Sequence, residues 1–405
     1  MTKLLLANLA SPANPGDQAI LLGTLKLLKT YFRQPEITLV TRASSGKKIY
    51  EKMGCHVLPS YPNVEKMDSD SSIKRILAIP GSFTDPDSLK KAVRTSDAVF
   101  LAGGAYLYSY RPLIPGLTYA SHFSAAYWAR HFKKPLILLP QSFGPFHSWI
   151  SRKFFDAAVA ASDLVFYREE ISGNFLKKKY PNSLKKINFL PDLALNLSTA
   201  DLLGRPPRTN LKTGIVGVTV RQWCITGQEN QAYIAQLADA LAQFHRQFHT
   251  KIRIVVQVQA RKKSEGDESV SRLLENLLVD RIGQGGVELR QKKPYFQLSE
   301  LCEIYEECEM LVATRLHSGL LAFLLGRPAL VIGYQHKAEG ILRSLGLDSF
   351  YGGFMDQIKS SDLYSKIEHL WRERESASRR IEENLAKTRS NIEIMFKEKM
   401  EGLAK

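Results

Sequence analysis

The sequence is poor in cysteine, with four among 405 residues: Cys55, Cys224, Cys302 and Cys308. They form no CxxC pair, and no paired histidines accompany them at a metal-binding spacing. Isolated cysteines of this kind indicate reduced thiols and argue against a disulfide framework or a zinc site. We therefore expect a cytoplasmic protein that holds no metal.

Long apolar runs are also missing. No stretch reaches the roughly 20 apolar residues that a membrane span needs. The apolar residues 4–7 are followed at once by Asn8 and a turn rich in Pro, Gly and Asp. They therefore predict a buried first strand and not a signal peptide. Contact with a membrane is expected to be peripheral only, at its inner face.

Acidic residues are outnumbered: 40 Asp and Glu stand against 56 Lys and Arg, which gives a formal net charge of +16. A solvated surface explains each short basic cluster by itself, but the total excess favours anionic partners such as phosphorylated ligands or acidic lipid headgroups. Zinc-finger spacing, a basic heptad region and an RNA-binding signature are all absent from the sequence. Nucleic acid is therefore not expected as a partner.

What is present is an alternation of short apolar strands and helices, in a chain long enough for two cores. Strands are expected near residues 3–8, 37–41, 98–101, 135–139 and 164–167, and a second series begins at residue 215 after a Pro-containing segment. This alternation predicts an α/β protein with two doubly wound parallel-sheet (Rossmann-like) domains, glycosyltransferase-B-like, and a C-terminal helix. We expect an N-terminal domain over residues 1–200, a C-terminal domain over 201–361 and a helical tail over 362–405.

The most informative motif is Arg315-Leu316-His317, where a strand ends and a helix begins. Free backbone N–H groups and the helix dipole favour an anion at such a junction. Arg315 can grip a carboxylate or phosphate with two hydrogen bonds, and His317 can move a proton near neutral pH. A histidine that only caps the helix would show the same spacing. Lys337 follows one strand–helix step later, so it is expected at the same edge of the sheet.

Other polar residues follow strands in the first half of the chain. Asn14 to Asp17 opens the first helix; Gly16 permits close backbone approach, and Asp17 is either an N-cap or a group that binds an acceptor hydroxyl. The remaining positions of interest are Gly103, Gly104, Gln141, Arg168 and Arg221.

Together these stretches resemble the polysaccharide pyruvyl transferase family. The resemblance runs from about residue 4 to residue 345, and its most specific part extends from Arg315-Leu316-His317 to Gly340. Arg168-Glu169 stands where the family usually has Arg-Asp. The resemblance implies phosphoenolpyruvate as the donor substrate, a pyruvate ketal across two sugar hydroxyls as the product, and no cofactor or metal.

The resemblance also assigns roles to residues. The donor-binding set comprises Arg168, Arg221, Arg315, Leu316, His317 and Lys337. The catalytic residues would be His317, Arg315 and Asp17, with His317 either protonating the enol carbon or stabilising the departing phosphate. The acceptor-binding set comprises Asn14, Gly16, Asp17, Gly103, Gly104 and Gln141.

The sequence does not identify the acceptor sugar or show whether it is lipid-linked. Two other functions also remain possible. One is a glycosyltransferase of the same fold that uses a nucleotide sugar, with Glu339 on the ribose. The other is a protein that binds glycans or anions without catalysis.

Overall fold

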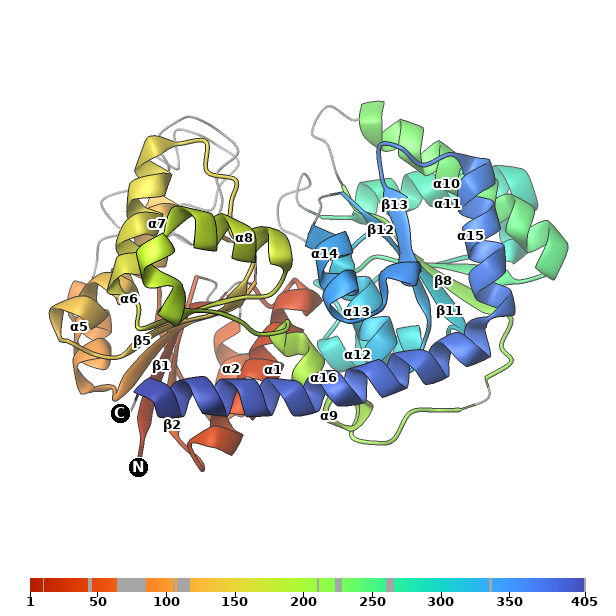
Figure 1. Cartoon of the computed structure of the whole chain (residues 1–405). Coiled ribbons are helices and arrows are strands. Elements are labelled where there is room, and N and C mark those ends of the chain that lie inside the picture. Colours follow the sequence, from red (N-terminus) through yellow and green to blue (C-terminus); the bar gives the residue numbers. More distant parts are fainter. Residues whose placement is uncertain are drawn as a thin grey trace. The chain divides into compact units, whose positions relative to one another are not determined.

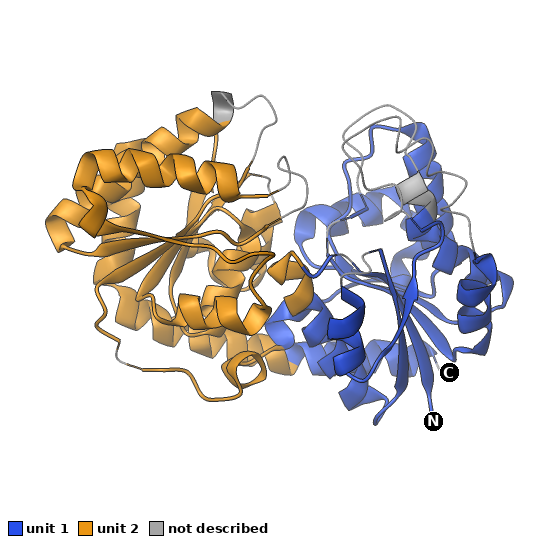
Figure 2. Cartoon of the chain, turned by 180° about the vertical axis from the view of Figure 1, so that it is seen from behind, with its two compact units in different colours: residues 1–12, 20–196, 391–405 blue, residues 13–19, 197–390 orange. Residues whose placement is uncertain are grey.

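The computed structural model describes residues 1–9, 11–42, 46–63, 85–104, 106–107, 117–209, 211–222, 228–259, 266–334 and 337–403. Cys224 lies outside these residues. The chain forms two compact units (Figure 2). Unit 1 comprises residues 1–12, 20–196 and 391–405, and unit 2 comprises residues 13–19 and 197–390. The main division therefore falls just before the expected boundary at residue 200, but each unit also takes a short segment from the other end of the chain.

Unit 1 is built on a parallel sheet of seven strands in the order β3-β2-β1-β4-β5-β6-β7. The strands are β1 (Lys3–Leu9), β2 (Glu36–Thr41), β3 (His56–Pro59), β4 (Ala98–Leu101), β5 (Leu136–Gln141), β6 (Leu164–Tyr167) and β7 (Ile187–Phe189). This order is doubly wound, and its direction reverses between β1 and β4. In such sheets ligands bind at the carboxyl ends of the strands beside the reversal.

Helices cover both faces of this sheet (Figure 1). The helices of unit 1 and their short 3₁₀ turns are α1 (Pro15–Tyr31, of which residues 15–19 belong to unit 2), α2 (Lys47–Lys52), α5 (Pro86–Thr95), α6 (Leu117–His131), α7 (Trp149–Ala161), α8 (Glu170–Lys179), η3 (Pro181–Lys186) and η4 (Leu193–Asn196). Leu5, Val99 and Leu138 point to the core under α5–α8. On the other face Phe396 packs its ring near those of Tyr31 and Phe166. The central strands β4 and β6 are apolar and buried along their whole length, because helices cover both faces of the sheet there.

Unit 2 repeats the plan with a parallel sheet in the order β10-β9-β8-β11-β12-β13. The strands are β8 (Ile215–Thr219), β9 (Lys251–Val255), β10 (Val287–Arg290), β11 (Met310–Ala313), β12 (Ala329–Gly333) and β13 (Tyr351–Phe354). Here the order reverses between β8 and β11. The expected fold class, two doubly wound α/β sheets, is therefore confirmed.

The helices of unit 2 include most of the segment that the sequence analysis treated as a separate tail. Unit 2 contains α9 (Thr199–Leu203), α10 (Gln228–Phe248), α11 (Glu268–Ile282), η5 (Gln284–Gly286), α12 (Leu298–Glu306), α13 (Leu316–Leu324), α14 (Lys337–Ser344), η6 (Asp348–Phe350), α15 (Ser360–Arg372) and the first part of α16 (Arg374–Leu403). Trp371 of α15 lies 5.6 Å from the ring of Phe244 in α10. The tail is thus two helices, and the first packs into unit 2 because it carries apolar residues on one side.

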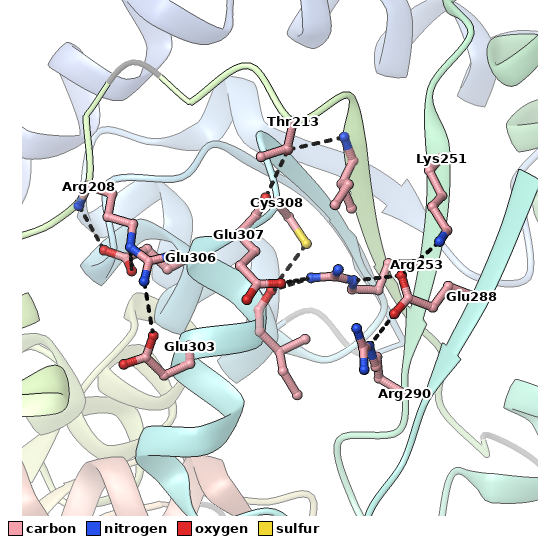
Figure 3. Close-up of polar contacts among 12 residues, drawn as sticks. Arg208, Thr213, Lys251, Arg253, Glu288, Arg290, Glu303, Glu306, Glu307 and Cys308 are labelled. Carbon is pink, nitrogen blue, oxygen red and sulfur yellow. Dashed lines mark hydrogen bonds and ion pairs between the residues drawn. The ribbon is translucent and has the colours of Figure 1, made fainter.

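The amino edge of the unit 2 sheet carries a network of ion pairs (Figure 3). Glu306, at the end of α12, is fully buried and pairs with Arg205 of the segment after α9 at 2.6 Å. Its carboxylate also accepts the backbone N–H of Arg208 at 2.8 Å. Beside it, Arg253 of β9 pairs with Glu307 at 2.5 Å. These contacts tie the segment after α9 to unit 2 at the edge opposite to the carboxyl ends of the strands.

Candidate functional site at the carboxyl edge of unit 2

Three of the predicted site residues lie at the carboxyl edge of the unit 2 sheet. Arg221 and Arg315 each come two residues after a strand, β8 and β11 respectively, and these two strands flank the reversal in strand order. Lys337 is the first residue of α14, after β12. Parallel strands bring their carboxyl ends to one edge, so the three cations belong to one end of the unit.

Arg315 stands at the N-cap position of α13 and is bound by a residue that sequence reasoning missed. Its Nε and Nη2 atoms each donate to a different carboxylate oxygen of Asp267, both at 2.6 Å. The side chain of Asp267 is completely buried, whereas that of Arg315 is 13% exposed. Burial lowers the pKa of Arg315, but the Asp267 carboxylate outweighs this effect and holds that pKa above its usual value. Arg315 is therefore a fixed cation with one edge of its guanidinium already occupied.

His317 lies in the first turn of α13 and is half-buried. The turn at the start of α1 lies directly against it: a Cβ atom added to Gly16 would be 2.6 Å from Cγ and 2.8 Å from Cβ of His317. Both residues belong to unit 2. Since real Cβ contacts are much longer, only glycine fits at position 16, and the structure brings this predicted acceptor residue to the predicted catalytic histidine.

The start of α1 also corrects one interpretation of Asp17. Asn14 caps the helix: its side-chain oxygen accepts from the N–H of Gly16 at 3.2 Å, and its carbonyl accepts from the N–H of Asp17 at 3.1 Å. Asp17 is the third helical residue, and its carboxylate accepts from the Asn14 amide at 2.8 Å. Asp17 is thus not the N-cap, because Pro15 already occupies the first helical position.

Arg221 is held by aromatic side chains. Its guanidinium carbon lies 3.8 Å from the centroid of the Tyr334 ring, a close cation–π contact. The hydroxyl of Tyr233 accepts from the backbone N–H of Arg221 and donates to its carbonyl. Burial raises the pKa of Tyr233, with Asp267 adding to the effect, so this hydroxyl stays protonated. The half-buried side chain of Lys337 supplies the third cation of this edge.

Below the site a buried amide connects three elements. Oε1 of Gln257, just after β9, accepts from the hydroxyl of Tyr305 at 2.6 Å and from the hydroxyl of Ser318, the residue after His317. All three residues are nearly inaccessible. Burial raises the pKa of Tyr305, which keeps the phenol a donor. This contact fixes the first turn of α13. No local pattern predicts it, because polar residues spaced this way are common in any chain.

Arg168, a predicted donor ligand, lies in unit 1 in a different environment. Its guanidinium pairs with the carboxylate of Asp192 and donates from Nε to the hydroxyl of Ser142 at 3.0 Å. Arg168 is 2% exposed and Asp192 is 1% exposed. An ion pair this deeply buried joins the exits of β5, β6 and β7, so its evident role is to order unit 1.

The glycine pair of unit 1 has a packing role. A Cβ atom at Gly103 would lie 2.5 Å from the carbonyl oxygen of Pro140, and Gly104 forms a parallel bridge with Gln141 at a φ of 129°. Backbone approach therefore explains both glycines. The side chain of Gln141 is completely buried at the end of β5.

A polar cluster at the same edge of unit 1 was missed by the sequence analysis. Asn8, the residue before the last of β1, has a φ of 70°, and its amide donates to the hydroxyl of Tyr106 at 3.1 Å and to the carbonyl of His122 at 3.0 Å. Burial raises the pKa of Tyr106 to about 12, while burial and the charge of Arg42 hold the pKa of His122 well below its usual value. The one signal in the sequence was an asparagine at the end of an apolar strand.

Among the described residues, no group of three or more His, Cys, Asp or Glu side chains is arranged to hold a metal ion. In the same part of the chain, no helix is long and apolar enough to span a membrane. The three cysteines in this part of the chain are free and buried.

Comparison with known families gives one model that covers most of the chain. The model described as polysaccharide pyruvyl transferase matches residues 14–336. A relative, the amylovoran biosynthesis protein AmsJ of Erwinia amylovora, is 24% identical over 388 residues, which cover 85% of this chain and 86% of that protein.

Comparison with solved structures shows the fold. The UDP-GlcNAc 2-epimerase of Neisseria meningitidis bound to UDP-GlcNAc is similar with a TM-score of 0.58 and 12% identity, over 99% of each chain. A glycosyltransferase of Rickettsia africae is similar with a TM-score of 0.55 and 12% identity, over 98% of each chain. At these identities the likeness concerns the fold alone, and it confirms the expected glycosyltransferase-B-like class.

Proposed function

Because the chain belongs to the polysaccharide pyruvyl transferase family, we propose that it transfers the enolpyruvyl group of phosphoenolpyruvate to a saccharide and forms a pyruvate ketal. The observation that carries this proposal is the convergence of Arg221, Arg315 and Lys337 on one edge of unit 2, next to His317. Phosphoenolpyruvate bears a carboxylate and a phosphate, and a site for it needs several fixed cations. Arg168 is left out of this donor set, since Asp192 and Ser142 occupy its guanidinium.

The reaction requires protonation of one carbon atom of the donor and departure of its phosphate group. A proton adds to the methylene carbon of the donor, which becomes a methyl group, and positive charge develops at the central carbon. One sugar hydroxyl forms a bond there, the bond to the phosphate oxygen breaks, and a second hydroxyl closes the ketal. The two hydroxyl protons balance the proton taken up at carbon and the one carried by phosphate. His317 is proposed either to deliver the first proton or to stabilise the departing phosphate.

The acceptor is proposed to bind beside the turn of α1 that contacts His317. Asp17, in the turn of Asn14 and Gly16, is proposed to accept a proton from a sugar hydroxyl. The net charge of +16 favours an acceptor presented at an acidic membrane surface, and sedimentation with anionic against neutral vesicles tests that part separately.

The decisive experiment is incubation with phosphoenolpyruvate and a panel of free and lipid-linked glycans. We expect a product heavier by one pyruvate less water, with an equal amount of phosphate released. His317→Ala should abolish both, whereas His369→Ala, an exposed histidine of α15, should leave both unchanged. Phosphate release without any change in acceptor mass would contradict the proposed transfer.

A nucleotide-sugar transferase is the second candidate, favoured by the likeness to the UDP-GlcNAc 2-epimerase structure. In the structure Glu339 pairs with Arg343 at 2.7 Å, so a ribose would have to compete for it. Thermal stabilisation by UDP or GDP, but not by phosphoenolpyruvate, would favour this candidate. Saccharide binding that persists in His317→Ala, with no turnover in either protein, would instead favour a non-catalytic glycan-binding role.

A further inference from the structure

Asp267 is a buried carboxylate at the start of α11 that joins the exits of three strands. It receives two hydrogen bonds from Arg315, which follows β11. It also accepts the backbone N–H of Gln222, after β8, at 3.3 Å and that of Val258, after β9, at 3.2 Å. The groups that donate to the Asp267 carboxylate therefore lie at the carboxyl edge, beside the reversal in strand order where ligands bind in this fold.

The geometry leaves one side of Arg315 for a ligand. A guanidinium has five N–H donors, and Asp267 takes those of Nε and one of Nη2. The remaining three belong to Nη1 and to the far side of Nη2, which together form a second fork of the kind that binds a carboxylate or phosphate. Asp267 has no exposed surface while Arg315 keeps 13%, so the part of the pair that solvent reaches belongs to the arginine.

We propose that Asp267 is a positioning residue that holds the Nη1–Nη2 edge of Arg315 toward an oxyanion of the donor. This inference rests on the proposed function, because it assumes that Arg315 binds the donor. A buried ion pair adds little net stability, but an arginine that is already oriented loses less rotamer freedom when an anion binds. The carboxylate would therefore act on ligand affinity and orientation more than on folding.

The sharpest test is Asp267→Glu, which keeps the charge but moves the carboxylate by one methylene group. Removal of the charge in Asp267→Asn is less informative for affinity, because the lost negative charge would by itself strengthen anion binding. The matched control is Glu306→Asp. Glu306 is a fully buried carboxylate of the same unit and pairs with Arg205 at the amino edge of the sheet. Its contact with Arg208 is drawn in Figure 3.

For Asp267→Glu we expect phosphoenolpyruvate to bind about 10- to 30-fold more weakly by calorimetry. The rate of phosphate release at saturating donor should fall about 100-fold, because a displacement near 1 Å has this effect on an oriented group. Glu306→Asp should change both quantities less than about twofold, even if it lowers the melting temperature as much as Asp267→Glu does. Unchanged affinity and rate in Asp267→Glu, or equal losses in Glu306→Asp, would overturn the positioning role.

A second measurement reports on Arg315 without a donor. In protein labelled with ¹⁵N-arginine, the Nε–H of Arg315, assigned with Arg315→Lys, should exchange slowly in the wild type and rapidly in Asp267→Asn. Equal exchange rates in wild type and Asp267→Asn would overturn the proposal. This comparison replaces the affinity and rate measurements if Asp267→Glu does not fold. If wild-type protein binds no phosphoenolpyruvate, the proposed function fails, and sulfate becomes the probe. Weaker sulfate binding in Asp267→Glu would then support the role of Asp267, and unchanged binding would overturn it.

Discussion

Replacement of Gly16 by alanine tests whether the first turn of α1 holds His317 in place. The added Cβ atom would lie 2.6 Å from Cγ of His317, whereas carbon atoms in contact are about 3.5–4.0 Å apart. The nearest atoms include Cβ of His317 at 2.8 Å, so rotation of the ring alone cannot relieve the contact. The turn or the start of α13 must move by roughly 1 Å.

The two effects of this substitution on stability have opposite signs. Alanine in place of glycine stabilises a helix by about 1 kcal/mol, and overpacking destabilises by about 1–3 kcal/mol. We therefore expect a net loss of about 0–2 kcal/mol in the free energy of unfolding. The loss in turnover should be larger, on the order of 100-fold, because a catalytic group displaced by about 1 Å loses its orientation.

The assay combines denaturant unfolding with the rate of phosphate release from phosphoenolpyruvate in the presence of an acceptor. Gly285→Ala is the control: nothing lies within 4 Å of its added Cβ atom, and it belongs to the same unit. This control should be neutral or slightly stabilising with full turnover. If Gly16→Ala gained about 1 kcal/mol of stability and kept full turnover, the contact with His317 would have no functional role.

Three further predictions concern the amino edge of unit 2 and its buried thiols. Glu306→Gln should destabilise the protein by about 2 kcal/mol in denaturant titration, because the charge-assisted bonds from Arg205 are lost; an unchanged midpoint would contradict this. Burial raises the pKa of Glu306, but the hydrogen bonds and charges of Arg205 and Arg208 together outweigh it, so the net pKa is lowered. The stabilisation by the Glu306 carboxylate should thus be complete above about pH 4.3, the pKa of Glu in the unfolded chain, and be lost as the pH falls through the lower pKa of the folded state. Urea midpoints of wild type and Glu306→Gln at a series of pH values test this. A constant difference between the two midpoints at every pH would refute it. Burial raises the pKa of Cys302, and it raises the pKa of Cys308 to about 12. Iodoacetamide should therefore label both thiols only after unfolding, as mass spectrometry can check; rapid labelling of the native protein would show that they are accessible.

Local sequence predicted the central strands well. Residues 98–101 and 164–167 were expected as strands and form β4 and β6 with those bounds. Strands buried on both faces are continuous apolar runs, which a sequence displays directly. The edge strands β7, β10 and β13 were not predicted, because each has only three or four residues and is partly exposed. Nothing local distinguishes such a segment from a loop.

For the site, the sequence by itself determined which charged residues follow the end of a strand. Arg315 and His317 follow an apolar run and precede a helix, so their place at the carboxyl edge of a sheet was predictable from short-range pattern. Only the tertiary structure decided their partners. Asp267 binds Arg315, Gly16 contacts His317, and Asp192 occupies Arg168, all through contacts between segments that are distant in the chain. Strand and helix signals depend on neighbouring residues. The partner of a buried charge depends instead on the order of the strands in the sheet, because that order decides which strand ends lie side by side.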